Sequence, residues 1–153
     1  MAIEDKNDKQ IQDLLENNFP IKAIPIDFND LNNRSLILRS SFPWAYEKTE
    51  SFTDRNYWYF MAQLNVDHID VIGVAQFFQN ANGELALTHL EVNKVFRRQG
   101  KTKEILDYLK RFVRFRHFKN ITVPCVEEHE RHFLRNGFVK KGFDLVWKND
   151  SIV

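Results

Sequence analysis

The sequence predicts an α/β domain in which β-strands and amphipathic helices alternate along the chain. Three observations support this class: apolar segments rich in β-branched and aromatic residues, an Asn-Gly turn between two of them, and a strongly amphipathic pattern after residue 100. The chain has 153 residues, of which 43% are hydrophobic, so it can bury one core and is too short for two ordinary domains. We therefore expect one domain over residues 21–150, preceded by an N-terminal arm or short helix over residues 1–20.

The first half of the domain contains three predicted strands and one predicted helix. Residues 21–26 form a first strand, and Pro25 places it at a sheet edge. Residues 30–42 have a helical pattern that stops before Pro43, because the residue before proline avoids the helical region. A loop or short helix follows to residue 55, and then come two strands over residues 56–64 and 70–79, the first with Tyr57, Tyr59 and Met61 on one face and Trp58, Phe60 and Ala62 on the other.

The second half begins with a strand over residues 85–92. The turn at Asn82-Gly83 pairs this strand antiparallel with residues 70–79. A helix is predicted over residues 103–118, with a core-facing stripe formed by Ile105, Leu106, Leu109, Phe112 and Val113. A strand over residues 121–123, a helix over residues 127–136 that ends at Gly137, and a hairpin of residues 138–140 and 143–148 complete the chain.

Composition narrows the class of protein. The chain has 22 Lys and Arg against 21 Asp and Glu, so its net charge of +1 produces no global field that attracts nucleic acid or an anionic membrane. The single Cys125 excludes an internal disulfide and a multi-cysteine zinc site, which is typical of a reducing cytoplasm. The polar start and the lack of a long apolar run argue against secretion and against a membrane span. We expect a cytoplasmic protein without a structural metal.

The strand over residues 85–92 leads through a basic, glycine-containing turn into the amphipathic helix. Such a turn directs free backbone N–H groups, the positive end of the helix dipole and cationic side chains at one point, where a phosphate or diphosphate can bind. A P-loop would need glycine where Val95 stands, and a dinucleotide-binding fold would need three glycines where only Gly100 is present. Both of these nucleotide-binding motifs are therefore disfavoured.

The turn does match a different spacing: Arg, two residues, Gly, one residue and a small residue, over residues 97–102. This spacing resembles the pyrophosphate-binding signature of the GNAT superfamily of acyl-CoA-dependent N-acetyltransferases. Residues 132–138, which follow the strand at 121–123, resemble a second landmark of the family, a short helix that ends in Gly-Phe. The resemblance covers roughly residues 71–148 and implies a GNAT fold, with a mixed, mostly antiparallel central sheet of six or seven strands and flanking helices.

The resemblance also implies where acetyl-CoA would bind. The strand that ends at Val92 should splay away from the strand at 121–123, and the pantetheine arm should lie between them with the thioester near residues 88–90. Its amides would contact the backbone of Leu90, Glu91 and Val92. The diphosphate would lie against the side chains and amides of Arg97, Arg98, Gln99, Gly100, Lys101 and Thr102.

Acetyl transfer needs a base that takes a proton from the amine and often an acid that protonates the leaving thiolate. The resemblance puts the usual base at Thr88, a poor base that can order a water at most, and the usual acid at Phe133, which has no proton to give. His89 is a better candidate base, because imidazole titrates near neutral pH, although an ideal strand would turn it away from Thr88 and a bulge would be needed to change that. Lower-ranked candidates are Glu127 and Glu128 as bases, His132 or Cys125 as proton donors, and Cys125 as a nucleophile. The leaving thiolate could also take its proton from water.

The acceptor site is expected over residues 41–60 and the last hairpin. Trp44, Tyr46, Tyr57 and Tyr59 could shape an aromatic pocket, and Glu47, Glu50 and Asp54 could attract a cationic amine. The same residues could instead serve loop packing and a solvated edge.

The favoured hypothesis is an N-acetyltransferase that moves the acetyl group of acetyl-CoA to a primary amine, on a small molecule or a protein terminus, by direct attack in a ternary complex. One alternative is a catalytically silent GNAT-fold module that binds CoA and regulates or binds another protein, since Thr88 and Phe133 occupy the usual proton-handling positions. Another is nucleic-acid binding through the basic helix over residues 103–119, whose charges a solvated helix face explains equally well. The aromatic content would allow a homodimer interface.

Overall fold

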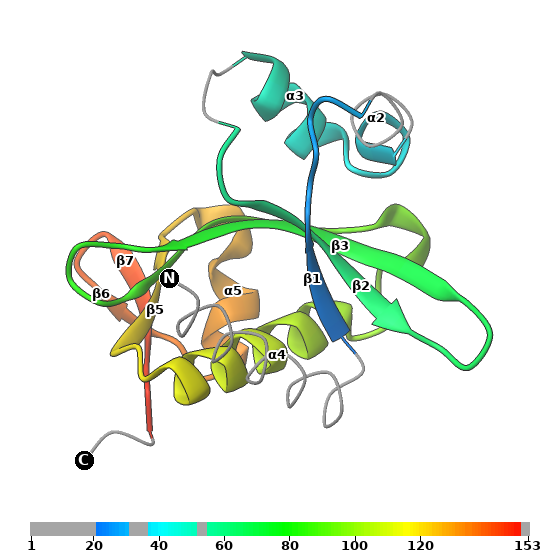
Figure 1. Cartoon of the computed structure of the whole chain (residues 1–153). Coiled ribbons are helices and arrows are strands. Elements are labelled where there is room, and N and C mark those ends of the chain that lie inside the picture. Colours follow the sequence, from blue (N-terminus) through cyan, green and yellow to red (C-terminus); the bar gives the residue numbers. More distant parts are fainter. Residues whose placement is uncertain (1–20, 31–36, 52–54, 151–153) are drawn as a thin grey trace, which may run out of the picture.

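The computed structural model describes residues 21–30, 37–51 and 55–150, and the side chains of residues 50, 51, 127 and 128 are outside the description. In this part of the chain the structure contains a seven-stranded sheet in the order β1-β2-β3-β4-β5-β7-β6 (Figure 1). Only β4 and β5 are parallel neighbours, and the other pairs are antiparallel. The strands are β1 (Ile21–Pro25), β2 (Trp58–Leu64), β3 (Ile69–Gln79), β4 (Leu85–Val92), β5 (Asn120–Pro124), β6 (Val139–Lys141) and β7 (Asp144–Lys148).

Helices cover both faces of this sheet. Figure 1 places α2 (Arg39–Ser41) and α3 (Pro43–Ser51) on one side, and α4 (Lys101–Arg116) and α5 (Glu127–Arg135) on the other. A short 3-10 turn, η2 (Lys94–Phe96), connects β4 to the loop before α4. The mixed, mostly antiparallel sheet with flanking helices confirms the fold class predicted from the sequence.

Most predicted elements are confirmed to within a few residues. Pro25 lies on the edge strand β1, the turn before β4 contains Gly83 at φ 76°, and Gly137 follows α5 at φ 87°. The predicted strand over residues 56–64 begins two residues later, because Tyr57 takes a positive φ of 66°. The predicted arm over residues 1–20 and residues 31–36 of the predicted helix lie outside the described residues, as do residues 52–54. Of the two alternatives for residues 44–55, a loop or a short helix, the structure shows the short helix, α3.

Two hydrophobic clusters hold the helices on the sheet. The larger cluster joins the apolar stripe of α4 to one face of the strands, including Met61 and Phe77, while the smaller cluster packs Leu38, Phe42 and Ala45 against Trp58 and Phe60. Because alternate residues of β2 enter different clusters, the predicted assignment of Tyr59 and Met61 to one face and of Trp58 and Phe60 to the other is confirmed.

A β-bulge in β4 decides which way the candidate base faces. Gln76 of β3 pairs with His89, but the next residue, Phe77, pairs with Leu87, so Thr88 is the extra residue. Leu87 and Leu90 consequently pack toward the α4 side. His89 contacts the Trp58 ring on the other face, with ring centroids 5.1 Å apart. Without the bulge, His89 would share the face of Leu87.

β4 and β5 separate soon after they meet. Their ladder contains only the pairs Leu85 with Ile121 and Ala86 with Thr122, whereas β4 continues to Val92 and β5 to Pro124. The ends of the two strands therefore diverge, and this confirms the splay that the resemblance implied.

Gly73 of β3 allows α4 to lie close to the sheet. A Cβ atom on Gly73 would come 2.7 Å from Cδ1 of Ile105 and 3.1 Å from the carbonyl oxygen of Glu91. We expect Gly73→Ala to lower the free energy of unfolding by about 1–3 kcal/mol, measured by urea denaturation, because a well-packed core resists an added methyl group.

A second substitution separates crowding from a backbone effect. Ile105→Val removes the Cδ1 atom that the new methyl group would meet, so the double variant Gly73→Ala with Ile105→Val should be more stable than the sum of the two single effects predicts. Strictly additive effects would contradict the assignment of the cost to this contact.

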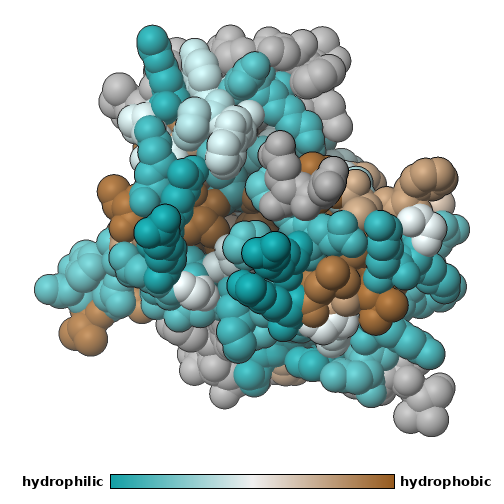
Figure 2. All heavy atoms as spheres, turned by 180° about the vertical axis from the view of Figure 1, so that it is seen from behind, coloured by the Kyte–Doolittle hydropathy of each residue, from teal (hydrophilic) through white to brown (hydrophobic). Residues whose placement is uncertain are grey.

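The exposed hydrophobic side chains are spread over the surface. Figure 2 shows hydrophobic residues in separate groups between hydrophilic ones on the side opposite the view of Figure 1. Phe143 and Val139 of the β6–β7 hairpin are the most exposed of the large hydrophobic residues near α5. No helix within the described ranges is long and apolar enough to cross a membrane.

Candidate active site

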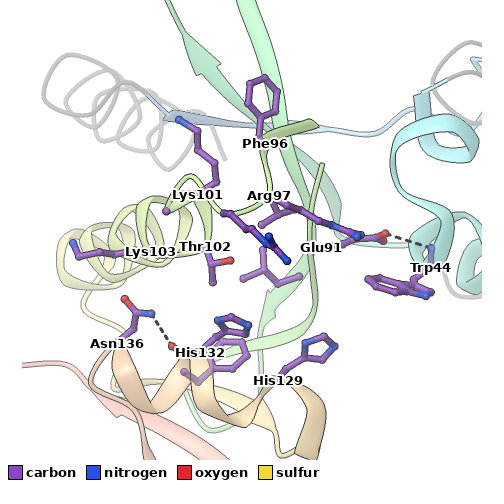
Figure 3. A pocket seen from close by; sticks show the side chains of 15 residues that line it. Trp44, Glu91, Phe96, Arg97, Lys101, Thr102, Lys103, His129, His132 and Asn136 are labelled. Carbon is purple, nitrogen blue, oxygen red and sulfur yellow. Dashed lines mark hydrogen bonds between the residues drawn. The ribbon is translucent and has the colours of Figure 1, made fainter. Parts of the chain in front are cut away.

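A cavity of about 470 Å³ lies between the end of β4 and the beginning of α4 (Figure 3). We call it the anion cavity. Its lining is mostly apolar and includes basic residues of the loop and of α4, a combination suited to a ligand with both an apolar arm and phosphate groups. It is lined by Trp44, Leu90, Glu91, Val92, Phe96, Arg97, Arg98, Gly100, Lys101, Thr102, Lys103, His129, His132, Phe133 and Asn136.

The N-terminus of α4 opens into the anion cavity. Gly100 precedes the helix at φ 72°, a left-handed conformation that glycine adopts at low cost, and no side chain caps the helix. The first backbone N–H groups of an α-helix have no partner within the helix, so those of Lys101 and Thr102 remain available to a ligand. Together with the helix dipole they favour an anion at this position.

The basic side chains between β4 and α4 have different partners. The Arg97 guanidinium lies 5.3 Å from the centroid of the Trp44 ring, at the side of the cavity in Figure 3. Lys101 also lines the cavity, but its ammonium group donates to Oε1 of Gln63 at 2.8 Å and pairs with Glu104, so these two partners hold its charge. Gln99 bonds to the Val95 carbonyl and does not line the cavity. Arginine and backbone groups, rather than Lys101 and Gln99, are therefore the candidate diphosphate ligands.

A second cavity, of about 360 Å³, occupies the splay between β4 and β5. We call it the splay cavity. Both strands line it, as do α3 and α5: its residues are Trp44, Lys48, Leu87, Thr88, His89, Leu90, Val123, Pro124, Val126, His129 and Phe133. The two cavities share Trp44, Leu90, His129 and Phe133. They are therefore adjacent, and a ligand in one can reach the other at these four residues.

Glu91 connects β4 to α3 and to His89. Its side chain is 1% exposed, and its carboxylate accepts the backbone N–H of Ala45 at 2.9 Å and of Trp44 at 3.4 Å. These N–H groups belong to the first turn of α3, so Glu91 caps a helix 46 residues away in sequence. Nε2 of His89 lies 3.3 Å from Oε1 of the same carboxylate.

This contact defines the tautomer that His89 needs to act as a base. A carboxylate only accepts hydrogen bonds, so the proton of a neutral His89 lies on Nε2, and Nδ1 keeps its lone pair. The ring packs against Trp58 and is 15% exposed, so its orientation is held from two sides. Because His89 lines the splay cavity, an oriented imidazole faces the space where an amine could enter.

The other candidate catalytic groups are less suitably placed. The Thr88 hydroxyl lies in the splay cavity but donates to the side chain of Gln76, at 2.8 Å. Cys125 packs against the larger hydrophobic cluster and lines neither cavity. Glu127 begins α5, and its side chain lies outside the described residues, as does that of Glu128.

Of the four aromatic residues assigned to the acceptor pocket, the structure brings only Trp44 to the cavities. Tyr46 packs against the smaller hydrophobic cluster, and the exposed Tyr57 ring lies on Phe78 because its backbone turns before β2 begins. Tyr59 stacks on Phe77 with centroids 4.4 Å apart, and burial together with the neighbouring Tyr57 and Tyr108 raises the pKa of its phenol. The period of the strand therefore turns Tyr59 toward α4 instead of toward the splay.

Sequence reasoning missed His129 as a site residue. It projects from α5 toward the strand β4 in Figure 3 and lines both cavities, whereas His132 lines the anion cavity only. His129 precedes Phe133 by four residues, a spacing that places both on one helix face. That spacing could have identified it, because Phe133 had already been assigned to the site.

The basic residues of α4 have partners within the described chain. Lys103 pairs with Asp107 at 2.6 Å, and Arg114 makes two hydrogen bonds to Asp150. Lys110 contacts the carbonyl of Asn136, and burial lowers the pKa of its ammonium group. These contacts favour a solvated face over a surface that tracks nucleic-acid phosphates. Among the described residues, no cluster of His, Cys, Asp and Glu could hold a metal ion.

Comparison with known proteins identifies the family to which this fold belongs. The model of the acetyltransferase (GNAT) family matches residues 26–138, about three quarters of the chain. Since the match covers more than half of the sequence, the chain belongs to this family. No curated protein sequence matches it significantly.

Solved structures agree on the fold. Tetrahymena GCN5 superposes with a TM-score of 0.61 at 13% identity, over 86% of this chain and 98% of that one. A GNAT acetyltransferase from Staphylococcus aureus Mu50 gives 0.54 at 15% identity, over 85% and 99%. AtaTR, determined with bound acetyl-CoA, gives 0.56 at 14% identity, over 86% and 93%. At these identities the comparison establishes the GNAT fold and leaves substrates open.

Proposed function

We propose that this protein is an acetyl-CoA-dependent N-acetyltransferase that transfers the acetyl group to a primary amine, by direct attack in a ternary complex. The observation that carries the proposal is the junction of the two cavities: the anion cavity begins at the uncapped N-terminus of α4, and the splay cavity begins where the anion cavity ends. A ligand with a diphosphate at one end and a thioester at the other fits this arrangement.

The residues present suit acetyl-CoA. Arg97 and Arg98 supply charge for the diphosphate, and Gly100 leaves the backbone open, because no atom lies within 4 Å of the position that its Cβ would take. The diverging ends of β4 and β5 leave backbone groups of Leu90, Glu91 and Val92 without a ladder partner on the β5 side, so they can bind the pantetheine amides. Bound acetyl-CoA would supply the activated acyl group.

In this proposal residues of the chain remove the proton from the amine. His89, held by Glu91 and Trp58, takes the proton directly or through a water ordered by Thr88. Trp44 and Lys48 line the wall of the splay cavity from α3. A small amine or a protein terminus that enters between α3 and β5 would meet His89 there.

One observation favours a catalytically silent CoA-binding module as the second candidate. The Thr88 hydroxyl is engaged with Gln76, and Phe133 offers no proton, so neither position that the family commonly uses can transfer one. The two candidates share coenzyme binding and differ in turnover.

The experiment has two stages. First, the purified chain is titrated calorimetrically with acetyl-CoA, and micromolar binding with competition by CoA is expected. Second, release of the free CoA thiol is followed with a panel of amines that includes polyamines, amino acids, aminoglycosides and peptides with free N-termini. Binding without turnover on a broad panel would favour the silent module, and no binding of acetyl-CoA or CoA would refute both candidates.

A further inference from the structure

Phe133 stands where GNAT acetyltransferases usually have their catalytic acid, and its ring has no acidic proton. Phe133 is 6% exposed, packs edge-on against Phe138 with centroids 5.2 Å apart, and contributes only hydrocarbon to both cavities. If this chain transfers an acetyl group, the leaving sulfur needs another source of a proton. The inference that follows therefore rests on the proposed function.

One titratable side chain lies at the junction where that sulfur must leave. Of the four residues that line both cavities, Trp44, Leu90 and Phe133 carry no acid–base group, whereas His129 carries an imidazole ring. His129 lies one turn before Phe133 on α5, so its ring and the Phe133 ring enter the site from the same helix face. An exposed imidazole can also regain a proton from water after each turnover.

Other donors among the described residues are placed less well. His132 lines the anion cavity alone, on the diphosphate side of the junction. Cys125 lines neither cavity. The ring of Tyr59 stacks on Phe77 on the α4 side of the sheet, and Tyr59 also lines neither cavity. His89 lines the splay cavity from β4, and its contact with Glu91 orients it for proton removal. The two histidines thus have different neighbours and can do different work.

We propose that His129 is the general acid that protonates the leaving thiolate of CoA, in place of the residue missing at Phe133. The acceptor reacts as the neutral amine, after His89 has taken its ammonium proton and released that proton to solvent. As the amine nitrogen bonds to the acyl carbon, the carbon–sulfur bond breaks and sulfur leaves with the electron pair. The His129 imidazolium gives that sulfur its proton, while the proton lost by the amine goes to His89. The products are the acetylated amine and the CoA thiol, and solvent then reprotonates His129 and deprotonates His89.

The kinetic test uses His129→Ala, with Arg131→Ala as a control on the same helix, because Arg131 is exposed and lines neither of the two cavities. We expect kcat to fall about 100-fold in His129→Ala, at the lower end of the range for loss of a general acid or base. The dissociation constant of acetyl-CoA should change by a factor of about two at most. Arg131→Ala should retain the parent kcat.

A second variant separates acid catalysis from a structural role. His129→Ala combined with Phe133→Tyr places a phenol at the junction, and this double variant should regain roughly a tenth of the parent kcat, about ten times the kcat of His129→Ala. Added imidazole should also accelerate His129→Ala, because the site of the missing ring is open to water. A helix that merely needed His129 for packing would respond to neither.

A further readout uses the binary complex with CoA, without turnover. A neighbouring imidazolium stabilises a thiolate, so the ultraviolet absorbance of the bound thiolate should appear at lower pH in the parent protein than in His129→Ala. The other charged or titratable side chains that line the two cavities are the same in both proteins: Lys48, His89, Glu91, Arg97, Arg98, Lys101, Lys103 and His132.

The outcomes are distinct. An active parent protein with an equally active His129→Ala, or with no shift in thiolate absorbance, overturns the role of His129 and leaves the acetyltransferase proposal standing. A parent protein that binds acetyl-CoA and consumes no amine overturns both. Loss of kcat, rescue by Phe133→Tyr and the absorbance shift together support the acid.

Discussion

Gly100→Glu is expected to weaken acetyl-CoA binding about 100-fold or more, as measured by calorimetric titration. Gly100 lines the anion cavity directly before the first free N–H groups of α4. Nothing lies within 4 Å of its Cβ position, so a glutamate there would project into open space and bring a negative charge to the place where the diphosphate binds. Repulsion and lost backbone access act in the same direction.

The backbone strain of this substitution needs its own control. Gly100 has φ 72°, where any side chain costs about 1–2 kcal/mol relative to glycine. Gly142, in the turn between β6 and β7, has φ 64°, is also free of neighbours within 4 Å and lines neither cavity. Gly142→Glu should therefore lose similar stability and keep the parent affinity for acetyl-CoA.

A third variant separates charge from shape. Gly100→Ala carries the strain without the charge, and its affinity should lie between those of the parent and Gly100→Glu. Ligand binding stabilises the folded state, so acetyl-CoA should raise the melting temperature of the parent and of Gly142→Glu but hardly that of Gly100→Glu. Equal affinities for Gly100→Glu and Gly142→Glu would exclude the anion cavity as the coenzyme site.

The features predicted best from the sequence are turns and loops whose conformation depends on residues close together in the chain. The turn before β4 depends on Asn80, whose side chain accepts from the N–H groups of Asn82 and Glu84, and on Gly83 at a positive φ. Likewise, the course of the loop from Arg97 to Thr102 depends on positive φ angles within it, at Arg98 and Gly100, so its spacing was enough to predict a cavity at the start of α4. Such features are decided within a few residues.

Contacts between distant residues were harder to predict. The N-terminus of α3 is capped by Glu91, and the Lys101 ammonium is held by Gln63 of β2, so neither contact can be read from the neighbouring sequence. The bulge at Thr88 depends on pairing with Gln76, and it alone decides whether His89 faces α3 or α4. His129 reaches the cavities only because α5 packs beside the splay.

His89→Ala is expected to lower kcat for an amine acceptor about 100- to 1,000-fold at neutral pH, with little change in acetyl-CoA affinity. The loss follows from the protonation state of the acceptor: an alkyl amine such as a lysine side chain has a pKa of about 10.4, so a base must remove a proton before the nitrogen can attack. His89 lines the splay cavity and is oriented by Glu91, which makes it the candidate for this step.

The pH profile tests this reason directly. As the pH rises, a larger fraction of the free amine is already neutral and needs no base, so the activity of His89→Ala should climb toward that of the parent between neutral pH and the pKa of the acceptor. His68→Ala is a suitable control, because this exposed histidine lies in the β2–β3 turn and lines neither cavity. It should reproduce the parent profile.

Glu91→Gln distinguishes an oriented base from a histidine that is only packed. The amide keeps the size of Glu91 and one acceptor for the N–H of Ala45, but it no longer presents an oxygen-only group to Nε2 of His89. The preferred tautomer of His89 is therefore lost while the ring stays against Trp58, so kcat should fall while coenzyme affinity persists. If kcat is unchanged in Glu91→Gln and falls in His89→Ala, the imidazole acts without orientation by Glu91; if it is unchanged in both, the base lies elsewhere in the splay cavity.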